Sequence, residues 1–306
     1  MRINEDYMDD IRQDDLIQQP DMIDEEISNT LRNFLNDDYH PDTNDIDLTT
    51  IKFPHSYIHA DDYNQLSHFI NKFINHFGNK CDLNWIDTSD IIDFSQLFYK
   101  SKFNGDISKW DVSCGRNFRN MFEHSSFNGN ISKWNTSSAH DMGYMFNGSK
   151  FNRPIGKWNV SLVTDMEYMF AFSQFDRDIS GWDVSFVEDM SHMFENSQFN
   201  HPLGKWNTNS VLYMSYMFAT SFFDQDISGW DVSNVNDMEG MFSMSAFNHD
   251  ISSWDTSHVY CMAGMFEESK FNQDISKWNV SKVTDYEYMF DRCPIKQSYK
   301  PKKFGW

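Results

Sequence analysis

Acidic residues recur in this sequence at fixed distances from tryptophan, and regularly stacked carboxylates are able to bind calcium. Some Asp residues lie seven positions after a Trp and others lie one position after it: Asp141, Asp165, Asp189, Asp237 and Asp285 in the first set, and Asp111, Asp183, Asp231 and Asp255 in the second. Asn alternates with Asp in the second set, which weakens a calcium ladder. Because Asp also caps the free amides at the start of a short helix and suits the helix dipole, we interpret both sets as structural.

Histidine, serine and cysteine are weaker candidates for a chemical site. Among the scattered His residues, His201 and His249 share a register but lie two repeats apart, which is about 10 Å at one strand spacing per coil and too far for one ion. A column of Ser residues has no matching base and is typical of turn chemistry. No motif of a hydrolase elbow, zinc protease, phosphate loop or dinucleotide fold occurs. The four cysteines form no C-x-x-C pair, so we expect neither a disulfide nor zinc: Cys81, Cys114, Cys261 and Cys293. We therefore expect no metal, no cofactor and no enzyme activity.

These residues all belong to an array of repeats. Eight tryptophans follow one another at intervals of 24 residues without a slip: Trp110, Trp134, Trp158, Trp182, Trp206, Trp230, Trp254 and Trp278. One such unit is too small to bury a core of its own, so we expect stacked coils that share one core, with the Trp side chains inside it.

Within one unit, the apolar spacing predicts a short strand followed by a short helix. Trp182 and Val184 are two residues apart, which places both side chains on one side of a strand. Met190, Met193 and Phe194 follow at i, i+3 and i+4, which is one face of a helical turn. Two repeats show the Ser/Thr-x-x-Glu spacing of a capping box at the predicted helix start: Thr164 with Glu167, and Thr284 with Glu287.

The order I-x-x-W-x-V-x-x-V-x-x-M resembles the leucine-rich repeat pattern L-x-x-L-x-L with bulkier residues. More closely, FNxDISxWDVSxVxDMxxMF is similar to the BspA-like leucine-rich repeat family of bacterial surface proteins and mycoplasma lipoproteins. The resemblance covers about 80–294. It implies an α/β repeat solenoid of right-handed coils, each with a short strand in a parallel sheet and a short helix, and it implies no enzyme activity.

The sequence predicts four parts. An acidic arm (1–50) contains one amphipathic helix candidate at 22–36, which packs either onto the cap or onto a partner. A helical cap (51–79) has the amphipathic segment DDYNQLSHFINKFINHF at 61–77, with Gly78 as its stop. The solenoid (80–294) has one degenerate and eight full repeats, and a basic tail (295–306) follows it.

The N-terminal sequence has no apolar leader, and no run of 18 apolar residues occurs, so we expect neither a signal peptide nor a membrane span. Similar repeats also occur in large DNA viruses. By this looser analogy, we favour an intracellular or virion-associated location, unlike the exported members of the family.

Net charge points to a protein partner. The chain carries a net charge of −21, and from Asp178 to Glu268 there are 14 carboxylates against one base, Lys205. Such a field repels nucleic acid and attracts a basic protein. The hypothesis is a non-enzymatic interaction or structural protein, and the alternatives are a nucleic-acid mimic that occupies the groove of a DNA-binding protein and, third, an enzyme. The candidate interaction surface consists of Asp178, Asp183, Glu188, Asp189, Glu195, Asp226, Asp231, Glu239, Asp250 and Asp255.

Overall fold

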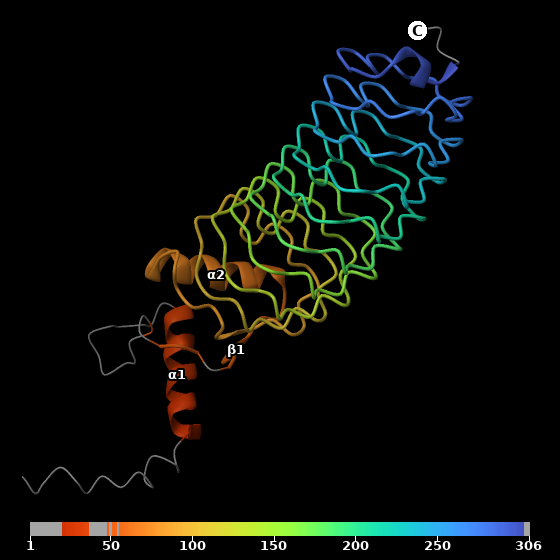
Figure 1. Cartoon of the computed structure of the whole chain (residues 1–306). Coiled ribbons are helices and arrows are strands. Elements are labelled where there is room, and N and C mark those ends of the chain that lie inside the picture. The colour runs from red at the N-terminus through yellow and green to blue at the C-terminus, as the bar shows by residue number, and fades with distance from the viewer. Residues whose placement is uncertain (1–19, 37–47, 49–50, 54, 303–306) are drawn as a thin grey trace, which may run out of the picture.

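A computed structural model describes residues 20–36, 48, 51–53 and 55–302, and shows two helices at one end of a long stack of coils (Figure 1). The elements follow in the order α1 (Pro20–Leu35), β1 (Ile58–His59), α2 (Tyr63–Phe77), β2 (Ile86–Asp87) and the 3-10 helix η2 (Gln297–Tyr299). Most of the predicted acidic arm and the last four residues of the predicted tail lie outside the described residues. Of the helices described, none has the length and apolar character needed to cross a membrane.

Helix α2 covers the first coil of the stack. The Asp62 side chain accepts a hydrogen bond from the N–H of Gln65 at 2.8 Å, which caps the start of the helix. One face of α2 is buried, and its Phe73 ring centroid lies 5.0 Å from that of Trp85 in the first coil. The helix therefore shields the apolar end that a stack of coils would otherwise expose.

Helix α1 packs on α2. Leu31 and Phe34 of α1 are buried, and the ring of Phe34 meets that of Phe73 edge-on, with centroids 5.5 Å apart. Lys72 of α2 donates a hydrogen bond to the Leu35 carbonyl at 2.8 Å. The sequence allowed this segment to pack either onto the cap or onto a partner, and its described contacts are with the cap. Strand β1 then pairs in parallel with β2, which ties the N-terminal part to the stack.

Coils are joined by a parallel ladder of main-chain hydrogen bonds. Isolated parallel bridges link the residue seven positions after Trp in one coil to its equivalent in the next, from Asn117 to Asp285. From each bridge, alternate N–H groups donate to carbonyls of the following coil, for example Met142 to Asp165 at 3.0 Å, Tyr144 to Glu167 at 2.7 Å and Phe146 to Met169 at 3.0 Å. Intervening N–H groups donate three positions back along the chain, so the ladder is a run of β-turns stacked on equivalent turns.

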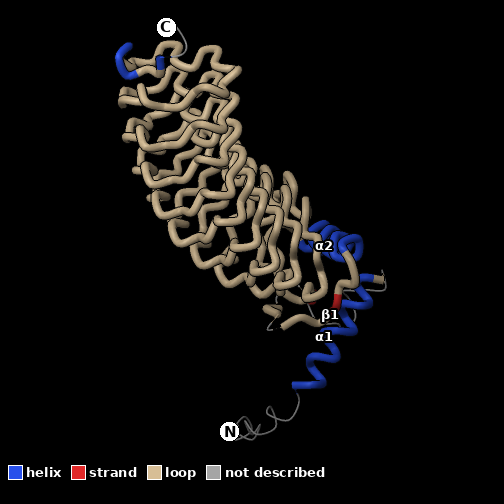
Figure 2. The backbone as a smooth tube through the Cα atoms, turned by 90° about the vertical axis from the view of Figure 1, so that its right-hand side faces the viewer, coloured by secondary structure: helices blue, strands red, loops and turns tan. Residues whose placement is uncertain are grey.

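The described repeats from 80 to 294 contain none of the predicted α-helices, and a strand is assigned at the predicted position only in the degenerate first repeat, as β2. Most of the stack is loop and turn (Figure 2), and the stretch from Trp182 to Val184 carries no strand. Met190 and Met193 face the core because the Met193 N–H bonds to the Met190 carbonyl within a β-turn, where His192 has φ 58°. The capping boxes are absent too. The Thr164 hydroxyl donates to the His140 carbonyl, and Thr284 donates to Tyr260 in the same way.

The tryptophans form a buried column. All eight are between 3% and 5% exposed, and neighbours such as Trp134 and Trp158 stack nearly parallel with centroids 6.3 Å apart. Each indole N–H donates to a carbonyl of the preceding coil, as Trp182 does to Ile155 at 3.2 Å. The polar end of each indole is therefore satisfied inside the core, while its ring fills the space between coils.

Stacked rings outside the core lie closer together than the buried tryptophans. Ring centroids are 4.6 Å apart for Tyr144 and Tyr168 and 4.0 Å for Tyr168 and His192, against 6.3 Å for Trp134 and Trp158. These rings belong to the hydrogen-bonded ladder, so the ladder side of the stack carries its own row of aromatic contacts.

The segment after the last repeat closes the other end. Ile295 is buried, and the N–H of Ile275 donates to the Tyr299 carbonyl at 3.0 Å, next to η2. The Lys300 ammonium lies 5.1 Å from the ring centroid of Phe290. The described part of the predicted basic tail thus packs on the final coil.

Trp182→Ala tests the buried column. We expect a loss of about 3–5 kcal/mol in the free energy of unfolding, because the change removes a buried aromatic and leaves a cavity in mid-stack. Urea denaturation measures it. Phe186→Ala in the same coil is the matched control, since Phe186 is 61% exposed and its loss should change stability by less than about 0.5 kcal/mol. Equal losses in the two variants would contradict the buried position.

Candidate functional site

The Asp residues that recur at fixed distances from Trp form turns. Asp178, Asp183 and Asp189 each accept a hydrogen bond from the N–H two positions further on, at 2.9, 3.1 and 2.8 Å. Asn159 makes the same bond at 3.0 Å, which explains why Asn and Asp alternate in this column. Each side chain satisfies an amide at a corner of the coil, so the cap expected at a helix start is an Asx turn instead.

The acidic residues chosen from the sequence as a candidate interaction surface lie at three positions around each coil. They divide among different turns of the coil: Asp178, Asp226 and Asp250 lie in the turn before Trp, Asp183, Asp231 and Asp255 in the turn after Trp, and Glu188, Asp189, Glu195 and Glu239 along the ladder. A nucleic-acid mimic needs carboxylates in rows spaced like phosphates, about 3.4 Å along each strand. The observed division does not support that alternative.

The His and Ser candidates have separate roles in the stack. His201 contacts Asp176 at 3.2 Å and His249 contacts Asp224 at 3.4 Å, each pairing with the preceding coil. Ser221 is buried, and its hydroxyl donates to the Phe218 carbonyl at 2.7 Å, as expected for turn chemistry.

A cleft of about 470 Å³ lies between the cap and the first coils, with Phe53, Lys80, Cys81, Asp82 and Lys109 in its lining. The Lys109 ammonium donates to the Phe53 carbonyl at 2.7 Å. Burial raises the pKa of the Cys81 thiol to about 12, which keeps it protonated and a poor nucleophile. Among the described lining residues, no nucleophile is paired with a base.

The ladder face, meaning the side of the stack that carries the inter-coil hydrogen bonds, holds a connected polar cluster centred on Arg119. Its Nη1 lies 2.8 Å from Asp165 and 3.5 Å from Asp141, and its Nη2 lies 2.8 Å from Glu167. The guanidinium carbon is 4.9 Å from the ring centroid of Tyr144. One arginine therefore joins three successive coils through carboxylates and an aromatic face.

A row of rings runs along the same face. Tyr144, Tyr168, His192 and Tyr216 stack with centroids 4.6, 4.0 and 4.9 Å apart. The Tyr144 and Tyr216 hydroxyls donate to Glu167 at 3.3 Å and to Glu239 at 2.7 Å. Burial and these carboxylates raise the pKa of both tyrosines above the ordinary value, so both remain hydrogen-bond donors at neutral pH.

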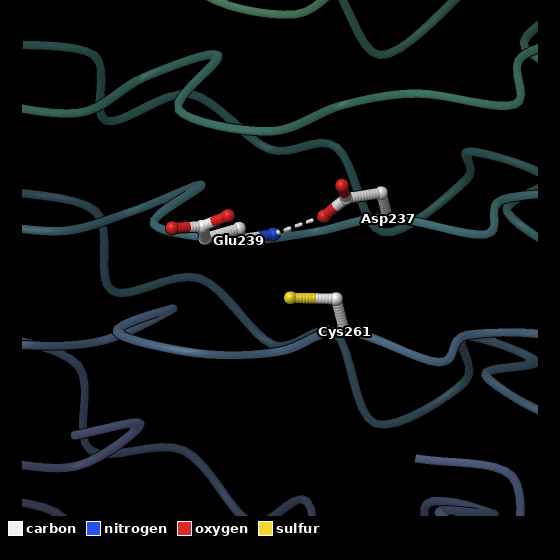
Figure 3. A group of neighbouring side chains, drawn as sticks. All are labelled: Asp237, Glu239 and Cys261. Atoms are coloured by element: carbon white, nitrogen blue, oxygen red, sulfur yellow. Dashed lines mark hydrogen bonds between the residues drawn. The ribbon is translucent and has the colours of Figure 1, made fainter. Parts of the chain in front are cut away.

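Asp237, Glu239 and Cys261 form another polar group on the ladder (Figure 3). One ligand atom from each lies within 4.8 Å of the others, close enough to hold a cation. The Asp237 carboxylate accepts the Glu239 N–H at 2.8 Å. Burial and the adjacent carboxylates raise the pKa of Cys261 to about 11, and a metal would have to displace that thiol proton.

Sequence reasoning did not find Arg119 or the ring row. The sequence did contain a signal for the ring row, because the residue type ten positions after Trp changes from repeat to repeat. The residues at this position are Asn120, Tyr144, Tyr168, His192, Tyr216, Gly240, Gly264 and Tyr288. A column that varies within a regular repeat marks positions that the core does not determine.

A family described as Mycoplasma protein of unknown function, DUF285, matches residues 65–174, 147–246 and 219–300. The three overlapping matches run without a gap from α2 to the C-terminal end of the stack. Comparisons with curated proteins and with solved structures found no match.

Substitution of Asp183 tests the turn role of the Asp columns. Asp183→Asn should leave the free energy of unfolding within about 0.5 kcal/mol of the parent, because the amide oxygen accepts the same bond. Asp183→Ala should cost about 0.5–1.5 kcal/mol, the net worth of that bond. Urea denaturation with and without calcium measures both. A calcium-dependent midpoint that disappears in Asp183→Asn would show a cation ladder instead.

Asp237 should make stability depend on pH. Burial, with the nearby Glu239 carboxylate, raises the pKa of Asp237, so the folded state binds this proton more tightly than the unfolded state. Stability from this group is present below the ordinary pKa of about 3.9 and is lost as pH rises through the raised pKa. Asp237→Asn should therefore be more stable than the parent at about pH 7, with the difference disappearing by about pH 3.5. Urea midpoints across this range test it, and a less stable variant at neutral pH would contradict it.

Proposed function

The chain belongs to the DUF285 family of mycoplasma proteins of unknown function, and on this premise we propose that it is a non-enzymatic repeat protein whose ladder face docks a protein partner. The right-handed path of the coils and the narrower BspA-like assignment are part of this proposal. The stack contributes an invariant core and a curved surface whose side chains vary from coil to coil.

Backbone geometry supports a binding role for the ladder face. Tyr144, Tyr168 and Tyr216 have φ values of 58°, 54° and 53°, in the left-handed region that favours glycine. Gly240 occupies the equivalent turn position with φ 56°. A non-glycine residue costs about 1 kcal/mol or more in this conformation. Residues of several types keep such φ values along the ladder, so its turns present large side chains where glycine would be easier to accommodate.

Exposed aromatic groups on the same face suit a protein partner. Phe172 is 48% exposed, Tyr213 39% and Tyr260 46%, and all three belong to the hydrogen-bonded ladder. Aromatic side chains are enriched where proteins bind one another. Because carboxylates surround them, the partner that this chemistry favours is a basic protein.

Affinity capture with a ladder variant tests the proposed function. The full chain is used to capture proteins from its native source, and the bound proteins are identified by mass spectrometry. We expect a stoichiometric partner that Tyr213→Ser/Tyr260→Ser loses and that rising salt releases, because the contact combines aromatic and charged groups.

Asp231→Asn is the matched control for this capture. Its Asx turn follows Trp230, outside the ladder, and Asn preserves that turn, so the same partner should be recovered. A partner retained equally by the tyrosine double variant and the parent, or no stoichiometric partner at low salt, would refute the proposed function.

A further inference from the structure

The Arg119 cluster shows how this ladder holds a guanidinium. Arg119 starts in one coil, crosses the next and ends between Asp165 and Glu167 two coils on. Gly143 lies beneath its path, and a Cβ on Gly143 would collide with Nη1. The site therefore combines a pair of carboxylates with a tyrosine beside them, and Gly143 leaves room for an arginine that reaches them from an earlier coil of the same chain.

The same arrangement occurs again three coils further along the stack. Asp237, Glu239 and Tyr216 stand where Asp165, Glu167 and Tyr144 stand in the first cluster. The Glu239 N–H bonds to Asp237 at 2.8 Å, as the Glu167 N–H bonds to Asp165 at 2.8 Å. In both clusters the tyrosine hydroxyl donates to the glutamate. The second set thus repeats the first in its carboxylates and in its position along the ladder, with His192 stacked on Tyr216 where Arg119 lies over Tyr144.

The second cluster differs in having no arginine. Ser191 stands at the position of Arg119, and Ser215 stands at the position of Gly143. Within the described residues, neither Asp237 nor Glu239 has an ion pair with a basic side chain. Two half-buried carboxylates are left close together without a cation, an arrangement that is costly unless a cation arrives from outside.

Aromatic residues border this uncompensated pair. Tyr213 is joined to Asp237 by a parallel bridge, and Tyr260 precedes Cys261, which is joined to Asp237 by the next bridge. Tyr213 occupies the position that Asp141 holds in the first cluster, so the second cluster has one carboxylate fewer and one ring more. Carboxylates beside exposed rings match a planar cation that forms paired hydrogen bonds and also stacks.

We propose that Asp237 and Glu239 bind the guanidinium group of an arginine in a basic segment of a partner protein, with Tyr213 and Tyr216 beside it. Arginine fits better than lysine because its planar fork pairs with two carboxylates at once, as Arg119 does within this chain. This inference rests on the proposed function and specifies which chemistry of the partner the ladder recognises. The competing ligand is a divalent cation held by the same carboxylates and Cys261.

Peptide titration followed by NMR of ring-labelled tyrosines tests the site. The probe is an acetylated, amidated pentapeptide with one central arginine between glycines, compared with the same peptide carrying lysine or citrulline. We expect the arginine peptide to shift the Tyr213 and Tyr216 signals, with weaker binding of lysine and none of citrulline. Asp237→Asn and Glu239→Gln should each weaken the arginine peptide by about tenfold or more, the loss expected for one charge-assisted hydrogen bond.

Two further variants make the result decisive. Asp231→Asn removes the same charge from a turn outside the ladder and should bind the arginine peptide as the parent does. Ser191→Arg/Ser215→Gly copies the first cluster into the second, so its own guanidinium should fill the site and abolish peptide binding. Equal binding of the arginine and citrulline peptides, equal losses in Asp231→Asn and Asp237→Asn, or zinc shifting these rings where the arginine peptide does not, would each overturn the inference.

Affinity capture separates this inference from the proposed function. If Glu239→Gln retains a partner that Tyr213→Ser/Tyr260→Ser loses, the ladder face docks a protein but Glu239 does not anchor its arginine. If all of these variants retain the partner, the proposed function fails as well.

Discussion

Main-chain hydrogen bonding between coils is the constraint on which the rest of this structure depends. A single coil has almost no regular structure of its own, and along the ladder its N–H groups reach carbonyls of the following coil. Buried amides need partners, so a coil is stable only when the next one lies against it. Equivalent residues then come to lie above one another, and the columns of Trp, Phe and Met are the apolar result.

Both ends of the stack meet the same constraint by different means. At the N-terminal end, α2 places Phe73 against Trp85 and β1 supplies a pairing partner for β2. At the C-terminal end, Ile295 covers apolar surface while the Tyr299 carbonyl accepts the N–H of Ile275. Each end thus receives both an apolar cover and hydrogen-bond partners, because the open face of a coil lacks both.

The ladder face combines a regular backbone with irregular side chains. Its turns repeat in every coil, yet Arg119 compensates one pair of carboxylates while Ser191 leaves the equivalent pair without a cation. Burial and the nearby Glu239 carboxylate raise the pKa of Asp237, so the charged form of this group is destabilised in the folded chain. A long shared core tolerates such a local cost, and this tolerance is what makes a repeat scaffold suitable for binding sites.

The spacing of tryptophan in the sequence was enough to determine the coil length and the columns of the core, because a strict period forces equivalent residues into equivalent environments. The spacing of Met190 and Met193 did not distinguish a helical turn from stacked β-turns, since both place residues that are three apart on one side. Hydrogen bonding to the next coil decided between them. The hydrogen bond between Tyr216 and Glu239 was likewise decided only by the tertiary structure. The turn conformation determines which side chains face each other across coils, and their spacing along the chain does not.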